Sequence, residues 1–136
     1  LPTGAMSDEG TSRHYGYPAG EVIQPSRALT RKIGSALGSA GLNAHRGPVW
    51  TTDAIYRETA AKVDRFRRAG ALAVEMELSA LFAVARFRGI AAAAVLAVSD
   101  ELSLLKWRAG FGDKRFKQTR RRIVDLLAGL PAALKM

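Results

Sequence analysis

Residues 72–89 read LAVEMELSALFAVARFRG and decide the fold class. The apolar run at the start predicts a strand, and from Glu77 the apolar side chains recur at helical spacing until a glycine ends the pattern. The apolar positions of that helix are Leu78, Leu81, Phe82 and Ala85. A strand that runs directly into a helix is typical of α/β folds. Glu75, Met76 and Glu77 stand at the junction, where sheets of this class bind ligands.

The same alternation of strand and helix runs along the rest of the chain. Further helices are expected from Ser26 to a glycine cap at Gly41, over residues 58–69, and from Asp113 to near Pro131. Strands are expected over residues 47–52 and 91–98. The second of these, AAAAVLAV, suits a buried strand or a buried helix, and its short length favours the strand. The pattern predicts a largely parallel sheet in a single domain over residues 1–136.

Composition limits the class of protein. Hydrophobic residues make up 48% of the 136-residue chain, enough for a packed core. No apolar run approaches the ~20 residues of a membrane-spanning helix, so no membrane partner is expected. The chain has no cysteine and only two histidines, so disulfides, thiolate metal sites and zinc clusters are not expected and no metal is predicted. A cytoplasmic location fits this composition.

The formal net charge of +9 raises the alternative of a nucleic-acid-binding module. The basic residues gather in residues 65–68 and 114–122, both on segments predicted as amphipathic helices. Solvated helix faces explain them better, so nucleic acid is an unlikely partner. The positive field would also favour an anionic small-molecule substrate.

Three acidic positions at predicted strand ends are candidates for chemistry. A carboxylate in Glu75–Glu77 can accept hydrogen bonds from the vicinal diol of a ribose, with Met76 beneath the sugar; alternatively, Glu77 is only a favourable first-turn charge of the helix. Asp100 follows an apolar run and could donate a proton, or it could cap a helix with Ser99. Asp53 precedes Ile55 and Tyr56, which offer an apolar wall to a base, although core packing explains Ile55 equally well.

Four blocks of the chain then resemble one known family. They are Asp8–Ser12 with His14-Tyr15, Trp50–Glu58, Val74–Glu77 and Val98–Leu102. In this order and spacing they resemble the nucleoside phosphorylases, which include purine nucleoside and uridine phosphorylases. The resemblance implies a three-layer α/β/α sandwich and cleavage of the ribose–base bond by inorganic phosphate, with no other cofactor. It covers only the second half of the family's domain, so the sandwich is expected to be truncated on its N-terminal side.

The resemblance also implies roles for individual residues of the sugar site. Glu77 would bind the ribose hydroxyls, Met76 would pack under the sugar, and Glu75 would line the nucleoside pocket. Val74 completes this part of the predicted substrate-binding set.

Base recognition and catalysis are implied by a second group of residues. Ile55 stands where the family usually places a phenylalanine against the base, and Tyr56 follows it. Asp100 matches the residue that protonates the departing base in purine-specific members, and Arg115 matches an arginine that assists this acid.

The chain departs from the family pattern in two respects. Thr59 and Ala61 replace the glutamine and arginine that read uracil, which favours a purine-type nucleoside. The phosphate-binding glycine loop and arginines of the family's first half have no counterpart among these residues. Three alternatives therefore stay open: a nucleosidase that uses water, a catalytically incomplete fragment, and the basic nucleic-acid-binding module. A half-sheet would expose an edge and an apolar face, so a homo-oligomer is expected.

Overall fold

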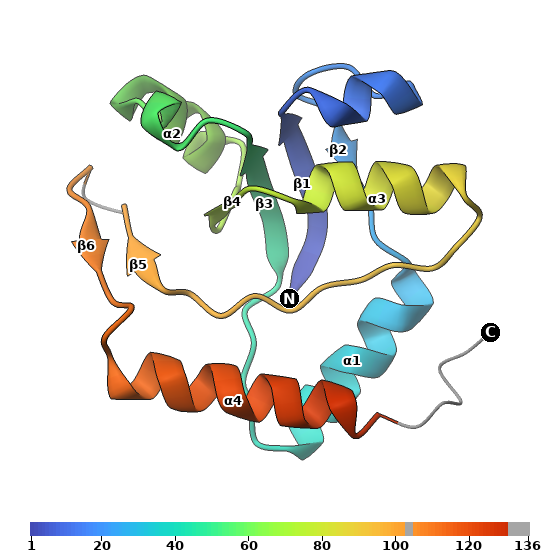
Figure 1. The fold of residues 1–136 in the computed structure, drawn as a ribbon, viewed down its shortest axis with the longest axis vertical. Helices are drawn as coiled ribbons and strands as arrows, with labels where there is room; N and C mark the ends of the chain where they lie inside the picture. Colours follow the sequence, from blue (N-terminus) through green and yellow to red (C-terminus); the bar gives the residue numbers. More distant parts are fainter. Residues whose placement is uncertain (103–104, 131–136) are drawn as a thin grey trace.

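The computed structural model describes residues 1–102 and 105–130, which form a mixed sheet flanked by helices (Figure 1). The strand order in the main sheet is β2-β1-β3-β4. These strands are β1 (Pro2–Asp8), β2 (Val22–Ile23), β3 (Gly47–Thr52) and β4 (Val74–Glu75). β1, β3 and β4 run parallel to one another, and β2 pairs antiparallel with β1. A separate antiparallel pair joins β5 (Asp100–Glu101) to β6 (Arg108–Ala109).

Within the described residues, four α-helices follow the predicted pattern, and the first and last of them begin at their predicted capping residues. They are α1 (Arg27–Ser39), α2 (Ala60–Arg68), α3 (Leu78–Phe87) and α4 (Lys114–Ala128), with short 3-10 helices η1 (Thr11–Tyr15) and η2 (Ile55–Arg57). The Ser26 side chain accepts an N–H bond at the start of α1, and Asp113 does the same for α4. Gly41 has the expected left-handed conformation, with φ of 65°. The predicted helix end near Pro131 lies outside the described residues.

Consecutive residues of β3 face opposite sides of the sheet and meet different helices. Val49 packs in one buried cluster with Phe82 of α3, which passes in front of β1 in Figure 1. Trp50 faces the other side, where its ring stacks on Phe66 of α2 with centroids 4.5 Å apart. Helices therefore cover both faces of the sheet, and the predicted α/β/α sandwich is confirmed.

The prediction of a strand over residues 91–98 is wrong. This segment is extended, and its side chains alternate: Ala92 and Leu96 pack toward the α3 cluster, whereas Ala93 and Val95 pack toward α1 and α4. Within the described residues it nevertheless belongs to no sheet. The segment instead fills the space between the two clusters, and the carbonyl of Ala92 accepts the N–H group of Ser26 at 2.7 Å rather than that of a strand.

One position of α3 also differs from the prediction. Leu78, Phe82 and Ala85 are buried as expected, but the side chain of Leu81 is 56% exposed. Leu81 lies at the margin of the helical stripe that faces the sheet. Within the described ranges, the structure contains no helix with the length and apolar character needed to cross a membrane.

Candidate functional site

The Glu75 carboxylate caps the start of α3. Its Oε2 accepts hydrogen bonds from the backbone N–H groups of Glu77, at 2.8 Å, and Leu78, at 2.7 Å. Its Oε1 accepts a hydrogen bond from the Thr51 hydroxyl of β3. The first N–H groups of a helix have no partner within the helix, so a carboxylate there satisfies them and complements the helix dipole. The first-turn charge considered for Glu77 is thus supplied by Glu75.

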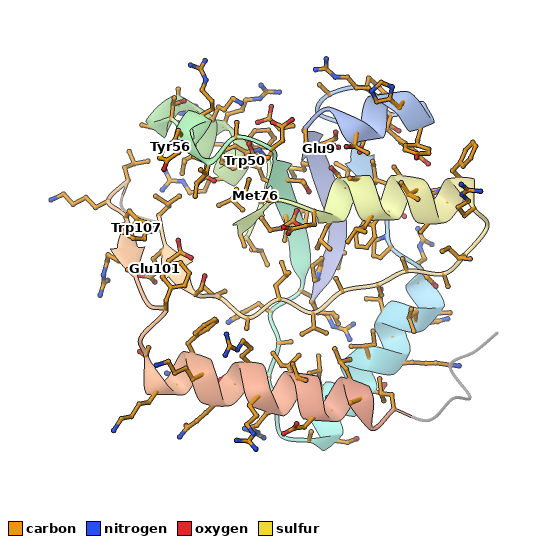
Figure 2. All side chains as sticks on the ribbon, in the orientation of Figure 1. Glu9, Trp50, Tyr56, Met76, Glu101 and Trp107 are labelled. Carbon is orange, nitrogen blue, oxygen red and sulfur yellow. The ribbon has the colours of Figure 1, made fainter. Side chains whose placement is uncertain are left out.

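Met76 and Glu77 remain available to a ligand at the same junction. The Met76 side chain is 42% exposed, and Figure 2 shows it beside the start of α3. Glu77 is exposed, and its carboxylate accepts a 3.3 Å bond from the Met76 N–H group. Val74 is half-buried in β4, opposite Trp50 in the register of the sheet. The exposed pair of the predicted sugar site therefore consists of Met76 and Glu77.

Burial raises the pKa of Glu75 above its ordinary value, and the charge of Glu77 adds to the rise. The hydrogen bonds from Thr51, Glu77 and Leu78 oppose this shift without cancelling it. The junction therefore carries one partly desolvated carboxyl group and one exposed carboxylate.

Asp100 lies in the small β5–β6 hairpin. Its carboxylate accepts a hydrogen bond from the Ser99 hydroxyl, at 2.6 Å, and another from the Trp107 ring N–H, at 2.8 Å. The residue is half-buried and begins a strand, so the alternative that Ser99 and Asp100 cap a helix is wrong. Two side chains therefore hold the carboxyl group of the predicted general acid in place.

The charge of Asp100 acts on Glu58, a residue that the sequence did not single out for chemistry. Burial raises the pKa of Glu58 above its ordinary value, and the charge of Asp100 raises it further. Glu58 follows η2, on which Ile55 is 57% exposed and Tyr56 is 98% exposed. The fold thus brings the predicted acid near the segment predicted to contact the base. The position of Glu58 at the end of the Trp50–Glu58 block was the available signal.

Asp100 and Arg115 line one cavity of about 1050 Å³. It is lined by residues 95–101, β6 and α4 on one side and by residues 1–2, 41–45, 47 and 72–73 on the other. Its lining does not include Glu75, Met76 or Glu77. Arg115 is exposed near the start of α4. The structure therefore brings the two predicted catalytic residues to the same cavity.

The sugar-site residues and the acid are not in direct contact. Across residues 1–102 and 105–130, no hydrogen bond or ion pair joins Asp100 or Arg115 to the Glu75–Glu77 junction. In Figure 2, Glu101 and Trp107 of the hairpin lie to one side of Met76. The reason is topological: Asp100 sits on a separate hairpin, whereas the junction follows a strand of the main sheet. Among the described side chains, no group of three or more His, Asp or Glu residues gathers as metal ligands would.

Comparison with known proteins identifies the family of this chain. The family model described as the Phosphorylase superfamily matches residues 1–134. The chain belongs to the phosphorylase superfamily. This confirms the family expected from the four sequence blocks, while the roles of the individual residues stay predictions.

Two curated members of the phosphorylase superfamily illustrate the similarity. A guanosine phosphorylase of Halorubrum lacusprofundi is 37% identical over 102 residues, which cover 75% of this chain and 42% of that protein. A DeoD-type purine nucleoside phosphorylase of Bacillus cereus is 40% identical over 74 residues, which cover 54% of this chain and 32% of that protein. The chain therefore spans less than half the length of these curated relatives.

A solved structure shows the same fold. The AMP nucleosidase from Bacteroides thetaiotaomicron superposes with a TM-score of 0.66 and 25% sequence identity, over 94% of this chain and 50% of that one. Phosphorylases and a nucleosidase of the phosphorylase superfamily thus both resemble this chain.

Proposed function

We propose that this protein cleaves the N-glycosidic bond of a purine-type nucleoside, with inorganic phosphate as the attacking co-substrate. Its membership of the phosphorylase superfamily and its similarity to guanosine and purine nucleoside phosphorylases support this proposal. One structural observation carries it: Glu75 is used as a helix cap, which leaves the Glu77 carboxylate exposed beside Met76 at the carboxyl end of β4.

The junction has the chemistry that a ribose requires. The two oxygens of the Glu77 carboxylate can accept hydrogen bonds from the two neighbouring hydroxyls of the sugar. The Met76 thioether offers a soft apolar contact to the face of the ring. Ile55 and Tyr56, exposed on η2, offer apolar contacts to the base.

The proposed reaction transfers the ribosyl group to phosphate. A phosphate oxygen forms a bond to C1′ of the ribose, the bond from C1′ to the base nitrogen breaks, and its electron pair goes to the base. Protonated Asp100 gives its proton to the imidazole side of the base, so that the base leaves as a neutral molecule. The charge of Asp100 acts on Glu58, after burial, to raise the pKa of Glu58, which places a second acidic residue close to the proposed acid. Arg115 would stabilise the carboxylate left on Asp100.

The direct test is the release of free base from inosine, guanosine, adenosine and uridine in phosphate buffer. We expect release from the purine nucleosides, with a large loss of activity in Glu77→Gln and Asp100→Asn. Glu21→Gln, a matched change at an exposed glutamate, should leave the rate unchanged. If the folded protein releases base from none of the nucleosides, the proposal is wrong.

A nucleosidase that uses water is the second candidate. The likeness to an AMP nucleosidase over 94% of this chain favours it. Base release in phosphate-free buffer, with free sugar as the second product, would identify this activity. Dependence on phosphate and formation of a sugar 1-phosphate would identify the phosphorylase.

We further propose that the protein forms a homo-oligomer, with nucleoside and phosphate as its small-molecule partners. Large apolar side chains at the rim of the 1050 Å³ cavity are exposed, among them Leu72 at 59% and Val98 at 68%. Sedimentation of the purified protein tests this proposal, and a monomeric mass at micromolar concentration would contradict it. The cytoplasmic location stays a prediction.

A further inference from the structure

A chain of buried hydrogen bonds connects the end of β1 to the start of α3. Glu9 follows β1, and its Oε1 accepts hydrogen bonds from the hydroxyls of Ser7, at 3.1 Å, and Ser79, at 2.8 Å. The N–H group of Ser79 donates to Oγ1 of Thr51 at 3.0 Å. The Thr51 hydroxyl in turn donates to Glu75. Ser7, Glu9, Thr51 and Ser79 are each at most 5% exposed.

Glu9 is the charged residue at one end of this series of hydrogen bonds. Its burial acts to raise its pKa, but hydrogen bonds from Ser12, Ser79 and Thr11 outweigh burial and hold the pKa of Glu9 below its ordinary value. The backbone N–H groups of Thr11, at 2.6 Å, and Ser12, at 3.3 Å, both donate to Oε2. An ionised carboxylate only accepts hydrogen bonds, so the hydroxyl of Ser79 must point toward it.

The direction of the next bond follows from the same rule. Oγ1 of Thr51 accepts the N–H group of Ser79, so the single hydrogen of its hydroxyl is free to donate to Glu75. Both Glu75 oxygens are then committed, Oε1 to Thr51 and Oε2 to the N–H groups of Glu77 and Leu78. Each donor hydrogen in this series of hydrogen bonds has one assigned acceptor, which favours a single arrangement of the backbone.

The exposed carboxylate at the junction lies between two anchored points. On one side, the N–H group of Glu77 is held by Glu75, and on the other side Ser79 is held by Glu9 and Thr51. Glu77 itself has φ of −130° and ψ of −33°, outside the helix that begins at the next residue. Its N–H group donates to Glu75, and its carbonyl accepts the first hydrogen bond of α3, from the Leu81 N–H group at 3.0 Å, so its backbone is held on both sides.

We propose that Thr51 and Glu9 are positioning residues that hold the Glu77 carboxylate in register for the two hydroxyls of a ribose. This inference rests on the proposed function of the junction. Thr51 acts through Glu75, and Glu9 acts through Ser79. Neither residue needs to touch the nucleoside.

A positioning role and a purely structural role predict different ligand dependence. If the series of hydrogen bonds only stabilises the fold, its disruption weakens the binding of every nucleoside by the same factor. If it aligns Glu77, the loss is larger for a ribonucleoside than for its 2′-deoxy analogue, which offers Glu77 one hydroxyl fewer. The ratio of the two affinities therefore reports positioning.

The experiment measures the affinities of guanosine and 2′-deoxyguanosine by calorimetry. In Thr51→Val we expect guanosine affinity to fall about tenfold and 2′-deoxyguanosine affinity to fall much less. Thr51→Ser keeps the hydroxyl and should restore the wild-type ratio. Thr30→Val is the control, because it removes a 2.8 Å hydrogen bond from the buried Thr30 hydroxyl of α1 to the backbone carbonyl of Ser26. This bond lies away from the junction, so the ratio should not change.

A second measurement needs no ligand. Hydrogen exchange of the amides of Glu77, Leu78 and Ser79 should accelerate in Thr51→Val and in Glu9→Gln, relative to Thr30→Val. Glu9→Gln keeps the shape of the side chain and removes its charge. It is the variant to measure if Thr51→Val does not fold. Unchanged exchange at these amides in both variants overturns the positioning role, whatever the ligand result.

The outcomes separate the two proposals. If wild-type protein prefers guanosine and Thr51→Val keeps that preference, the positioning role is wrong and the proposed function stands. If wild-type protein binds neither nucleoside, or binds both equally, the ribose site itself is wrong and the positioning role is overturned with it. A reduced ratio in Thr51→Val that Thr51→Ser restores supports both.

Discussion

Thr51 and Glu75 are register partners of the parallel strands β3 and β4, and the threonine hydroxyl donates a hydrogen bond to the glutamate carboxylate. Register partners place their side chains on the same face of a sheet, here the face covered by α3. The bond turns the Glu75 carboxylate toward the start of α3. Of the two glutamates around Met76, the first is therefore part of the scaffold and the second faces solvent.

Glu75→Ala should destabilise the protein by about 1–2 kcal/mol, because it leaves the N–H groups of Glu77 and Leu78 and the hydroxyl of Thr51 without their acceptor. The measurement is urea unfolding followed by circular dichroism. Glu21→Ala, at an exposed position, is the control. Equal stability of the two variants would show that the cap contributes nothing.

The pH dependence of stability should carry the signature of Glu75. Burial raises the pKa of Glu75 above its reference value of 4.5, so the folded state holds this proton more tightly than the unfolded state does. The resulting contribution of Glu75 to the free energy of unfolding is fully present below the pKa of the unfolded state. It is lost as pH rises through the pKa of the folded state. Between pH 4.5 and neutrality, wild type should therefore lose stability relative to Glu75→Gln. A constant difference between the two unfolding curves across this range would contradict the assignment.

Glu9 should show the opposite dependence. The pKa of Glu9 lies below its reference value of 4.5, so its contribution is present above that value and is lost as pH falls through the folded pKa. Glu9→Gln should thus be less stable than wild type at neutral pH, and the gap should narrow as the solution is acidified below pH 4.5. Guanidinium would screen charges, so urea unfolding at several pH values is the suitable measurement. A gap that widens in acid would be evidence against the buried charge.

The opposite face of the sheet offers a test of the core. Phe66 of α2 is 4% exposed and stacks on Trp50, so Phe66→Ala should destabilise the protein by about 3–5 kcal/mol. Phe87 is a matched control on α3, because its side chain is 68% exposed, and Phe87→Ala should cost less than about 1 kcal/mol. Urea unfolding followed by circular dichroism measures both free energies. Similar costs for the two variants would contradict the assigned packing.

Local signals in the sequence predicted most of the helices. The serine before α1, the aspartate before α4 and the glycine after α2, Gly70 with φ of 91°, mark helix boundaries through contacts within a few residues. The apolar period of α3 depends on its own side chains in the same way. Such features need no knowledge of the distant chain.

The features that the sequence missed all depend on distant partners. Residues 91–98 are extended, and their side chains alternate between two clusters, but the backbone partners that would make them a strand depend on distant segments and are absent within the described residues. The spacing around Met76 could not show which glutamate turns back onto α3, because Thr51 on another strand decides it. The effect of the Asp100 charge on the pKa of Glu58 joins segments that are far apart in the sequence. Four sequence blocks therefore identified the superfamily and the candidate residues. The fold was needed to show which of these residues cap a helix and which are exposed to a ligand.

Trp107→Phe tests the environment of the proposed acid. The indole N–H donates a 2.8 Å hydrogen bond to Oδ2 of Asp100, and phenylalanine keeps an aromatic ring without this donor. Because the Trp107 side chain is 62% exposed, the change should leave stability within about 0.5 kcal/mol. Loss of the bond frees the Asp100 carboxyl group, so base release should slow about fivefold, since one positioning hydrogen bond contributes roughly 1 kcal/mol. Phe111→Leu, at a neighbouring exposed aromatic residue, is the control and should keep the wild-type rate. If Trp107→Phe and Phe111→Leu release base at equal rates, the Trp107 bond has no part in placing the acid.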